Sequence, residues 1–316
     1  MDSRLLCLAS FGLFVTVLNC DGAAAQERRA PAPTFNQRDT QGIFFDSLDD
    51  AFRGERPSLS KIQKAGADKA VAATNGSTES TSEKADAAGG WAKLIAPESL
   101  EDEIKRVKLH FDSVITTPGA FNGGGFQDAR LDLSILATLF AVVNEHPGDV
   151  RWKDQAAAAR DLIARTAFNC KAGSSQVFNE AKMRKADLQD LASGSGLANR
   201  DAEPETDWSM VVDRSPLMQY AEQLAGKLKA ASRDAKTAEE NNEQIQRDAQ
   251  LLAMIGQVLT REGLDEADDE DYAALSLSMT KAASAVAAAI ERGSYDIGSE
   301  IGAVTQSCDA CHEQYR

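Results

Sequence analysis

Two stretches of the chain, LATLFAVV at residues 136–143 and LAMIGQVL at residues 252–259, align with each other without a gap. Each carries apolar residues at helical spacing, and each falls in the second of four consecutive segments with that periodicity. The repeat therefore predicts a duplicated unit of four helices. Because the connections are short, neighbouring helices should run antiparallel. We expect an all-α fold of two up-down four-helix-bundle modules in tandem.

Helix-breaking residues mark the ends of these helical segments. Pro118 and the glycines at 123–125 follow the first segment, and HPGD at 146–149 follows the second. A polar link at 199–206 separates the two repeats. The modules are thus expected at 96–198 and 207–316, with helices over about 99–115, 128–145, 150–169, 176–192, 215–231, 241–261, 272–293 and from 297 onward.

The amino terminus has the pattern of an export signal. Arg4 precedes an apolar run from Leu5 to Leu18, and the alanines at 23–25 form a small-residue cleavage site. The run is shorter than the roughly 20 residues that span a bilayer. Residues 1–25 are therefore expected to be a signal peptide and the protein to be periplasmic. A lipid on Cys20 is the alternative, and we expect membrane attachment only in that case.

Residues 26–95 show no sustained hydrophobic period. Pro31, Pro33 and Pro57 interrupt the early part, and residues 74–90 are rich in Ser, Thr, Gly, Ala and charge. Such a composition buries too little apolar surface to offset the entropy of ordering. This segment is expected to be a disordered linker.

Composition excludes two classes of protein. The 316 residues include 34 Lys and Arg against 49 Asp and Glu, a net charge of −15. A chain of this sign repels the phosphate backbone, so nucleic acid is not an expected partner. Five cysteines are too few for a disulfide scaffold of this length. Part of the acidity is concentrated at 265–271, where it is either a solvated loop or a surface that attracts a basic redox partner.

Residues 308–312, Cys-Asp-Ala-Cys-His, form C-x-x-C-H, the attachment signature of a c-type haem. On a helix, residues three and four apart share a face, so Cys308, Cys311 and His312 should point the same way. The two thiols can then bond covalently to one haem, and His312 can ligate its iron from the proximal side. The site therefore implies a single haem c.

Two other chemistries use closely spaced Cys and His. A zinc site would need a fourth ligand, and the remaining candidates, His110, His146 and Cys170, form no paired motif. A redox-active dithiol would prefer a strand–helix context, which an all-helical chain does not offer. The export signal also favours haem.

The tail CDACHEQYR, on the last helix of a four-helix unit, resembles the C-terminal signature of the cytochrome c-prime family. The resemblance covers about 207–316, and it implies that Arg316 packs beside the proximal face of the haem. It also implies that Arg214 contacts a haem propionate and that Met218 lies over the distal face of the iron. Low-spin relatives carry a ligating Met there, so the resemblance implies a His312/Met218 pair suited to electron transfer. The alternative for Met218 is a role in the hydrophobic core.

The first module lacks the motif, because ADLQDL at 186–191 stands where the attachment site would fall. We therefore expect it to be haemless. His110 is expected to be a solvent-edge or packed residue, His146 to be exposed in its turn, and Cys170 to be a small buried residue.

These observations favour a monohaem c-type cytochrome that carries electrons between redox proteins and is not an enzyme. The alternative is a five-coordinate haem protein that binds nitric oxide or carbon monoxide, as high-spin cytochrome c-prime relatives imply. Relatives often dimerise through their first two helices, so a homodimer is a further expectation of the resemblance.

Overall fold

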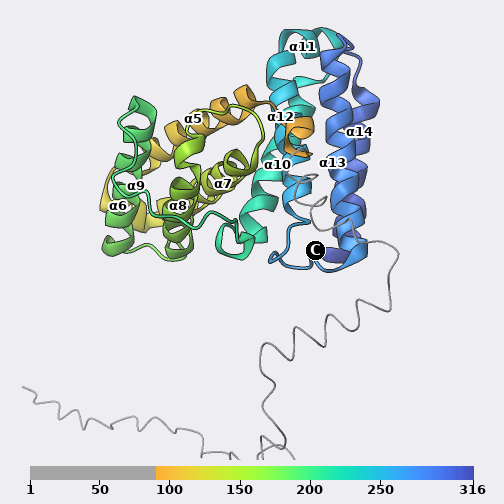
Figure 1. Cartoon of the computed structure of the whole chain (residues 1–316). Helices are drawn as coiled ribbons and strands as arrows, with labels where there is room; N and C mark the ends of the chain where they lie inside the picture. The colour runs from red at the N-terminus through yellow and green to blue at the C-terminus, as the bar shows by residue number, and fades with distance from the viewer. Residues whose placement is uncertain (1–89) are drawn as a thin grey trace, which may run out of the picture. The chain divides into compact units, whose positions relative to one another are not determined.

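The computed structural model describes residues 90–316. The expected signal peptide at 1–25, Cys20 and all but the last residues of the expected linker lie outside this part. Within residues 90–316 the regular structure is entirely helical, which confirms the all-α fold class (Figure 1). The α-helices are α5 (Pro97–Val114), α6 (Pro118–Ala120), α7 (Phe126–Glu145), α8 (Ala156–Asn169), α9 (Ser175–Ser193), α10 (Arg214–Ala231), α11 (Ala235–Glu240), α12 (Asn242–Val258), α13 (Glu270–Glu291) and α14 (Gly298–Tyr315).

The first set of helices is built around α7. This helix contacts α5, α8 and α10, and α9 contacts both α5 and α8, so that α5, α7, α8 and α9 close a ring. Burial explains the apolar run at 136–143, because a helix surrounded by others is hydrophobic on nearly all sides. Between α6 and α7 the chain turns through a π-helical segment, Phe121–Gly125. Gly124 has a φ of 140°, which an L side chain rarely adopts.

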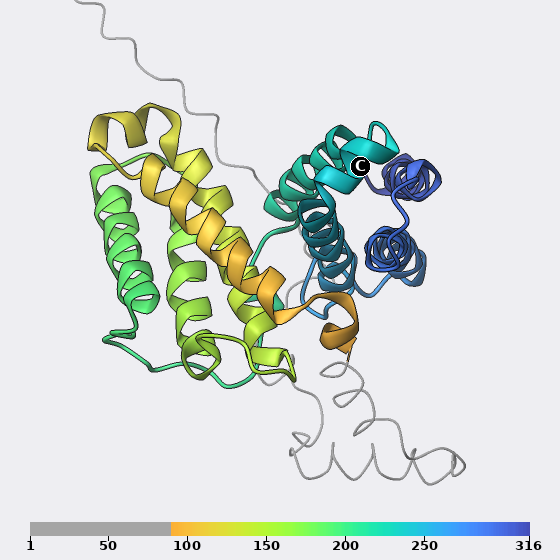
Figure 2. The ribbon, with the colours of Figure 1, turned by 90° about the horizontal axis from the view of Figure 1, so that it is seen from above.

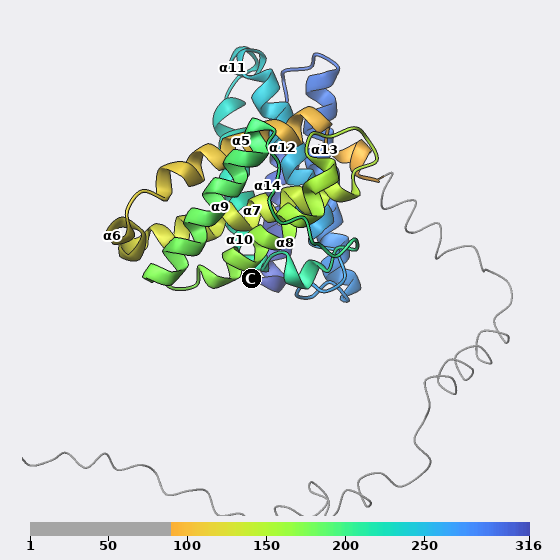
Figure 3. The same ribbon diagram turned by 60° about the vertical axis from the view of Figure 1, so that its left-hand side comes forward.

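The second set repeats this contact pattern. Helix α12 contacts α10 and α13, and α14 contacts α13 and α10, so these four helices also close a ring. Figure 2 shows α13 and α14 nearly end-on, whereas the helices of the first set run lengthwise across the view. The two sets meet where α7 contacts α10 and where α5 contacts α12 (Figure 3). All described residues fall in one compact unit, so the division into two separate modules remains a prediction.

The folded part begins earlier than predicted. Residues 90–94 are helical, and Trp91 is fully buried instead of lying in a linker that ends at residue 95. Its Nε1 donates a hydrogen bond to Glu145 Oε2 at 2.9 Å, and the Arg261 guanidinium lies 4.7 Å from its ring centroid. The local sequence is rich in Gly and Ala and gave no periodic signal. Trp91 is held by contacts with residues that are distant in sequence.

Helices α12 and α13 pack closely at Gly256. A Cβ added there would collide with Thr280 Oγ1 and would lie 2.8 Å from the Ser276 carbonyl oxygen. Thr280 Oγ1 is itself fixed, because it donates a 3.1 Å hydrogen bond to the Ala253 carbonyl oxygen. The absence of a side chain at 256 therefore sets the distance between the two helices.

Among residues 90–316, α13 is the helix long and apolar enough to cross a membrane, with a mean hydropathy of 1.4 over its best window. It contacts α12 along one side and α14 along another. A core helix of a soluble bundle passes the same test of length and composition, so this is weak evidence for a membrane span.

Candidate haem-attachment site

Helix α14 carries the C-x-x-C-H motif in its last turns. Its inward face is formed by residues three or four apart, of which Ile301, Val304, Cys308 and Cys311 pack against the core. Both cysteines are half-buried, and His312 is exposed. The structure thus turns the two thiols toward the core, as the spacing predicts, whereas His312 lies at the solvent-exposed edge of this face instead of pointing inward with them.

The two cysteines are free thiols in an environment that keeps them protonated. Burial raises the pKa of Cys308 above its ordinary value, and nearby Asp309 adds to the effect. Burial also raises the pKa of Cys311, although the charge of Arg214 opposes the shift.

Arg214 lies at the first position of α10 and reaches toward Cys311 and α13. Its guanidinium carbon is 5.9 Å from the ring centroid of Tyr272. Its Nη1 atom is buried and has no hydrogen-bond partner within the described part of the chain, although the side chain as a whole hydrogen-bonds Tyr272. A buried guanidinium nitrogen without an acceptor is costly, and a carboxylate is the group that it binds best.

Two tyrosines close this end of the second set. The rings of Tyr272 and Tyr315 meet edge to face with centroids 5.1 Å apart. Desolvation, together with the hydrogen bond and charge of Asp269, raises the pKa of Tyr315 to about 12, so its hydroxyl stays neutral. Asp269 also caps α13 by accepting the backbone N–H groups of Asp271 and Tyr272. One residue of the acidic run at 265–271 therefore has a structural role beside the motif.

Met218 and Arg316 are less closely tied to the motif. Met218 lies one turn after Arg214 on α10, where it is half-buried and packs against the hydrophobic core. That environment suits a core methionine as well as a ligand. Arg316 is exposed at the C-cap of α14. Of the residues carried over by resemblance, Arg214 lies near enough to Cys311 for its charge to lower the pKa of that thiol.

His146 differs from its prediction. It is 2% exposed, because the turn at 146–149 folds under Ile95. Its Nδ1 accepts a hydrogen bond from the Gly148 backbone N–H, so Nε2 carries the proton and donates to the Ile95 carbonyl oxygen at 3.2 Å. Burial lowers its pKa, which keeps the ring neutral. The HPGD sequence indicates the turn but not its burial.

Cys170 is fully buried, as predicted.

His110 pairs with a buried carboxylate. Its Nδ1 lies 2.7 Å from Asp132 Oδ2 on α7, while its own side chain is 55% exposed. Burial raises the pKa of Asp132 from 3.8 to about 6, and the hydrogen bond and charge of His110 oppose the shift. His110 is thus a solvent-edge residue, one of its two predicted positions, and it lies in the first set of helices.

Asp132 should make stability depend on pH. A carboxyl group whose pKa is higher in the folded than in the unfolded state stabilises the fold at low pH and loses this contribution as pH rises. We expect the wild-type urea midpoint to fall between about pH 4 and pH 6 relative to that of Asp132→Asn, which cannot ionise. Parallel midpoints over this range would contradict the assignment. Asp149→Asn, on an exposed aspartate, is the control.

Other ligand sites are poorly supported in the described part. No group of three or more His, Cys, Asp and Glu side chains within residues 90–316 is arranged to hold a metal ion. A haem iron does not need such a group, because the protein supplies only its axial ligands. A cavity of about 310 Å³ lies between α7, the end of α8 and α10, and its lining includes Arg130 and Pro216. None of its lining residues belongs to α13 or α14, so it is distinct from the motif.

Two residues at this end of the second set had no signal in the sequence that placed them beside the motif. Tyr272 was recognised as part of an apolar face but not as a neighbour of Arg214, and Tyr315 was recognised only as part of the tail. The contact between them depends on how α13 and α14 pack, which spacing within one helix does not reveal.

Comparisons with protein-family models, with curated proteins and with solved structures found no match to this chain.

Proposed function

We propose that the protein is an exported monohaem c-type cytochrome that carries electrons between redox proteins and has no catalytic function of its own. The observation that supports this most strongly is the C-x-x-C-H motif on one face of α14, beside a buried Arg214 nitrogen that lacks an acceptor. The cytochrome c-prime resemblance leads to the same proposal.

Each residue of the site would have a separate task toward the haem. Cys308 and Cys311, which lie on one face of α14, would hold it covalently. His312 would bind the iron, and Arg214 would neutralise a propionate. Bound haem would supply one-electron redox chemistry at a potential set by its axial ligands and surroundings. The apolar face of α14 and the ring of Tyr272 would exclude water from one side.

The acidic residues at 265–271 would face a basic partner. This segment joins α12 to α13 and reaches Tyr315, which lies close to the motif in the chain. All of its carboxylates are exposed, so they can raise the encounter rate with a positively charged protein. A basic redox protein is therefore the proposed partner.

Whether Met218 ligates the iron distinguishes the electron-transfer proposal from the gas-binding proposal. Its half-buried position on α10, one turn from Arg214, allows it to act either as sixth ligand or as core packing. If it ligates iron, the reduced protein should have a low-spin spectrum that carbon monoxide leaves unchanged. Met218→Ala should then become high-spin and bind the gas. Optical spectra of both proteins, with and without carbon monoxide, measure this.

The exposed Met210→Ala provides a matched control and should leave the spectrum unchanged. A wild-type spectrum that is high-spin and shifts with carbon monoxide would instead favour the second candidate, a five-coordinate protein that binds nitric oxide or carbon monoxide. Absence of covalent haem in the mass of the exported protein would contradict both.

A further inference from the structure

Helix α10 presents two different sides to its surroundings. Arg214 and Met218 are four residues apart and share the side that serves the proposed haem site. Asp213 and Tyr220 are seven residues apart, so they share another side two turns in length. Both of these residues bind side chains from the first set of helices. Helix α10, which contributes to the proposed site, is thus contacted by side chains from the other set of helices.

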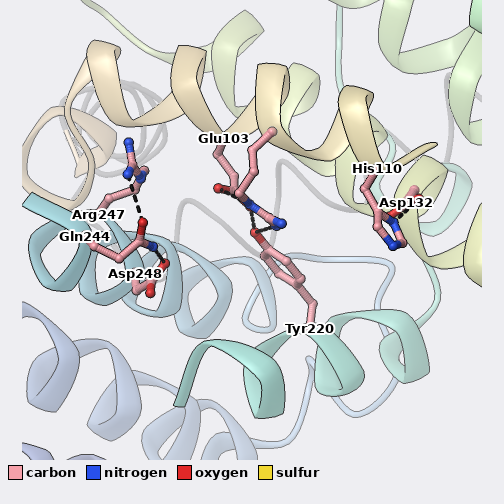
Figure 4. Close-up of polar contacts among 8 residues, drawn as sticks. Glu103, His110, Asp132, Tyr220, Gln244, Arg247 and Asp248 are labelled. Atoms are coloured by element: carbon pink, nitrogen blue, oxygen red, sulfur yellow. Dashed lines mark hydrogen bonds and ion pairs between the residues drawn. The ribbon is translucent and has the colours of Figure 1, made fainter. Parts of the chain in front are cut away.

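The first of these contacts is a buried polar group. Tyr220 is 2% exposed, and its hydroxyl donates to Oε1 of Glu103, a fully buried carboxylate on α5 (Figure 4). Arg106 Nε donates to both Glu103 oxygens at 2.9 Å, and its Nη2 reaches the Tyr220 oxygen at 3.3 Å. Because the Glu103 carboxylate is shielded from solvent, it depends on these donors for its hydrogen bonds. The hydrogen-bonded group therefore favours one position of α10 relative to α5.

The second contact is an ion pair at the start of the helix. Arg130 Nη2 of α7 lies 2.5 Å from Asp213 Oδ2, and Lys171 Nζ lies 3.6 Å from the same oxygen. Asp213 makes no side-chain cap for α10, because its carboxylate is turned toward these cations. The residue next to Arg214 is therefore fixed by α7.

The adjoining helix is held in a similar way. Arg247 of α12 pairs with Asp102 of α5 at 3.0 Å and also bonds Gln244, whose amide donates to Asp248. Figure 4 shows this second group on α12 beside the Tyr220 group on α10, both facing α5. The first set thus contacts α10 and α12 through named polar side chains.

From these contacts we infer that the first set of helices is a scaffold that positions the haem site, with Tyr220, Glu103, Arg106 and Arg130 as positioning residues acting through α10. The inference rests on the proposed function, and it assigns a role to a part of the chain that has no haem motif. The two contacts lie on either side of Arg214 and Met218 along the helix. Weakening either contact would make the turn of α10 that carries Arg214 and Met218 more mobile.

Two conservative variants of the full chain test the inference. Tyr220→Phe keeps the ring and removes the hydroxyl, and Arg130→Gln keeps the stem and removes the charge. We expect amide hydrogen exchange over 214–220 to become about tenfold faster in each, because local opening costs less free energy. We also expect the reduction potential and the haem absorption bands to shift in the same direction in both.

Tyr295→Phe and Arg165→Gln are the matched controls. Tyr295 is half-buried between α13 and α14, and Arg165 is exposed on α8, so neither change should alter exchange or spectrum. Circular dichroism checks that all four variants fold.

Unchanged exchange over 214–220 in both variants would overturn the inference, because the inference states that these contacts fix the position of α10. This exchange can be measured whether or not haem is bound. Faster exchange with an unaltered potential and spectrum, in protein that carries covalent haem, would also overturn it while leaving the proposed function intact. Absence of covalent haem from the wild-type protein would contradict the proposed function itself, whatever the exchange rates.

Discussion

Replacing Cys308 and Cys311 together by Ser should abolish covalent attachment of haem while leaving the helical fold in place. Both thiols lie half-buried on the inward face of α14, and Ser at these positions keeps a similar size but cannot form the bonds. The mass of the denatured, exported protein should decrease by one haem beyond the change in the two side chains. Each single variant should keep one bond and a less stable attachment.

Cys170→Ala provides the matched control for this experiment. Cys170 is fully buried at the end of α8, and burial raises the pKa of its thiol to about 12, so it is an inert thiol. The control protein should carry the same mass of haem as the wild type. Haem that remains covalently bound in the double variant would show that the attachment site lies elsewhere.

Gly256→Ala should be strongly destabilising, and Gly256→Val more so. The added Cβ would collide with Thr280 Oγ1 and would approach the Ser276 carbonyl oxygen to 2.8 Å, so α12 and α13 must separate. Overpacking of this kind costs about 1–3 kcal/mol or more, because nearby layers of the core lose contact as well. Urea unfolding followed by circular dichroism measures the loss.

Gly226→Ala is the opposite case in the same set of helices. Gly226 lies inside α10 at an exposed position, and nothing stands within 4 Å of the Cβ that Ala would add. An exposed Gly in a helix interior costs roughly 0.5–1 kcal/mol relative to Ala, so this variant should be more stable than wild type. Equal stability of Gly256→Ala and the wild type would mean that α12 and α13 are not packed as closely as described.

Local pattern predicted the helices because apolar spacing alone defines a buried face. The apolar residues proposed for α7, such as Leu133, Leu136 and Phe140, are all fully buried. What the pattern could not give were contacts between residues far apart in the chain. Trp91 stands in a segment without a period and is buried by Glu145 and Arg261. Gly256 stands in an ordinary helical stretch and has a special role only because α13 lies against it.

The candidate site shows the same division. Spacing placed Cys308 and Cys311 on one helical face, because that depends only on residues three apart in one helix. The family resemblance implied only that Arg214 contacts a haem propionate, and its neighbours Cys311 and Tyr272 and its buried nitrogen could be found only in the folded chain. The Glu103–Tyr220 contact had no signal in the sequence at all. A buried Glu inside a helix cannot be told from an exposed one without knowing its neighbours.

The burial of Trp91 also determines how unfolding of this protein can be observed. The three tryptophans, at 91, 152 and 208, all precede α10, whereas the haem motif lies on α14. Indole fluorescence therefore reports on the first set of helices and its junction, and the absorption of a bound chromophore would report on the second. Coincidence of the two signals during denaturation would mark one cooperative unit, and separate midpoints would mark two.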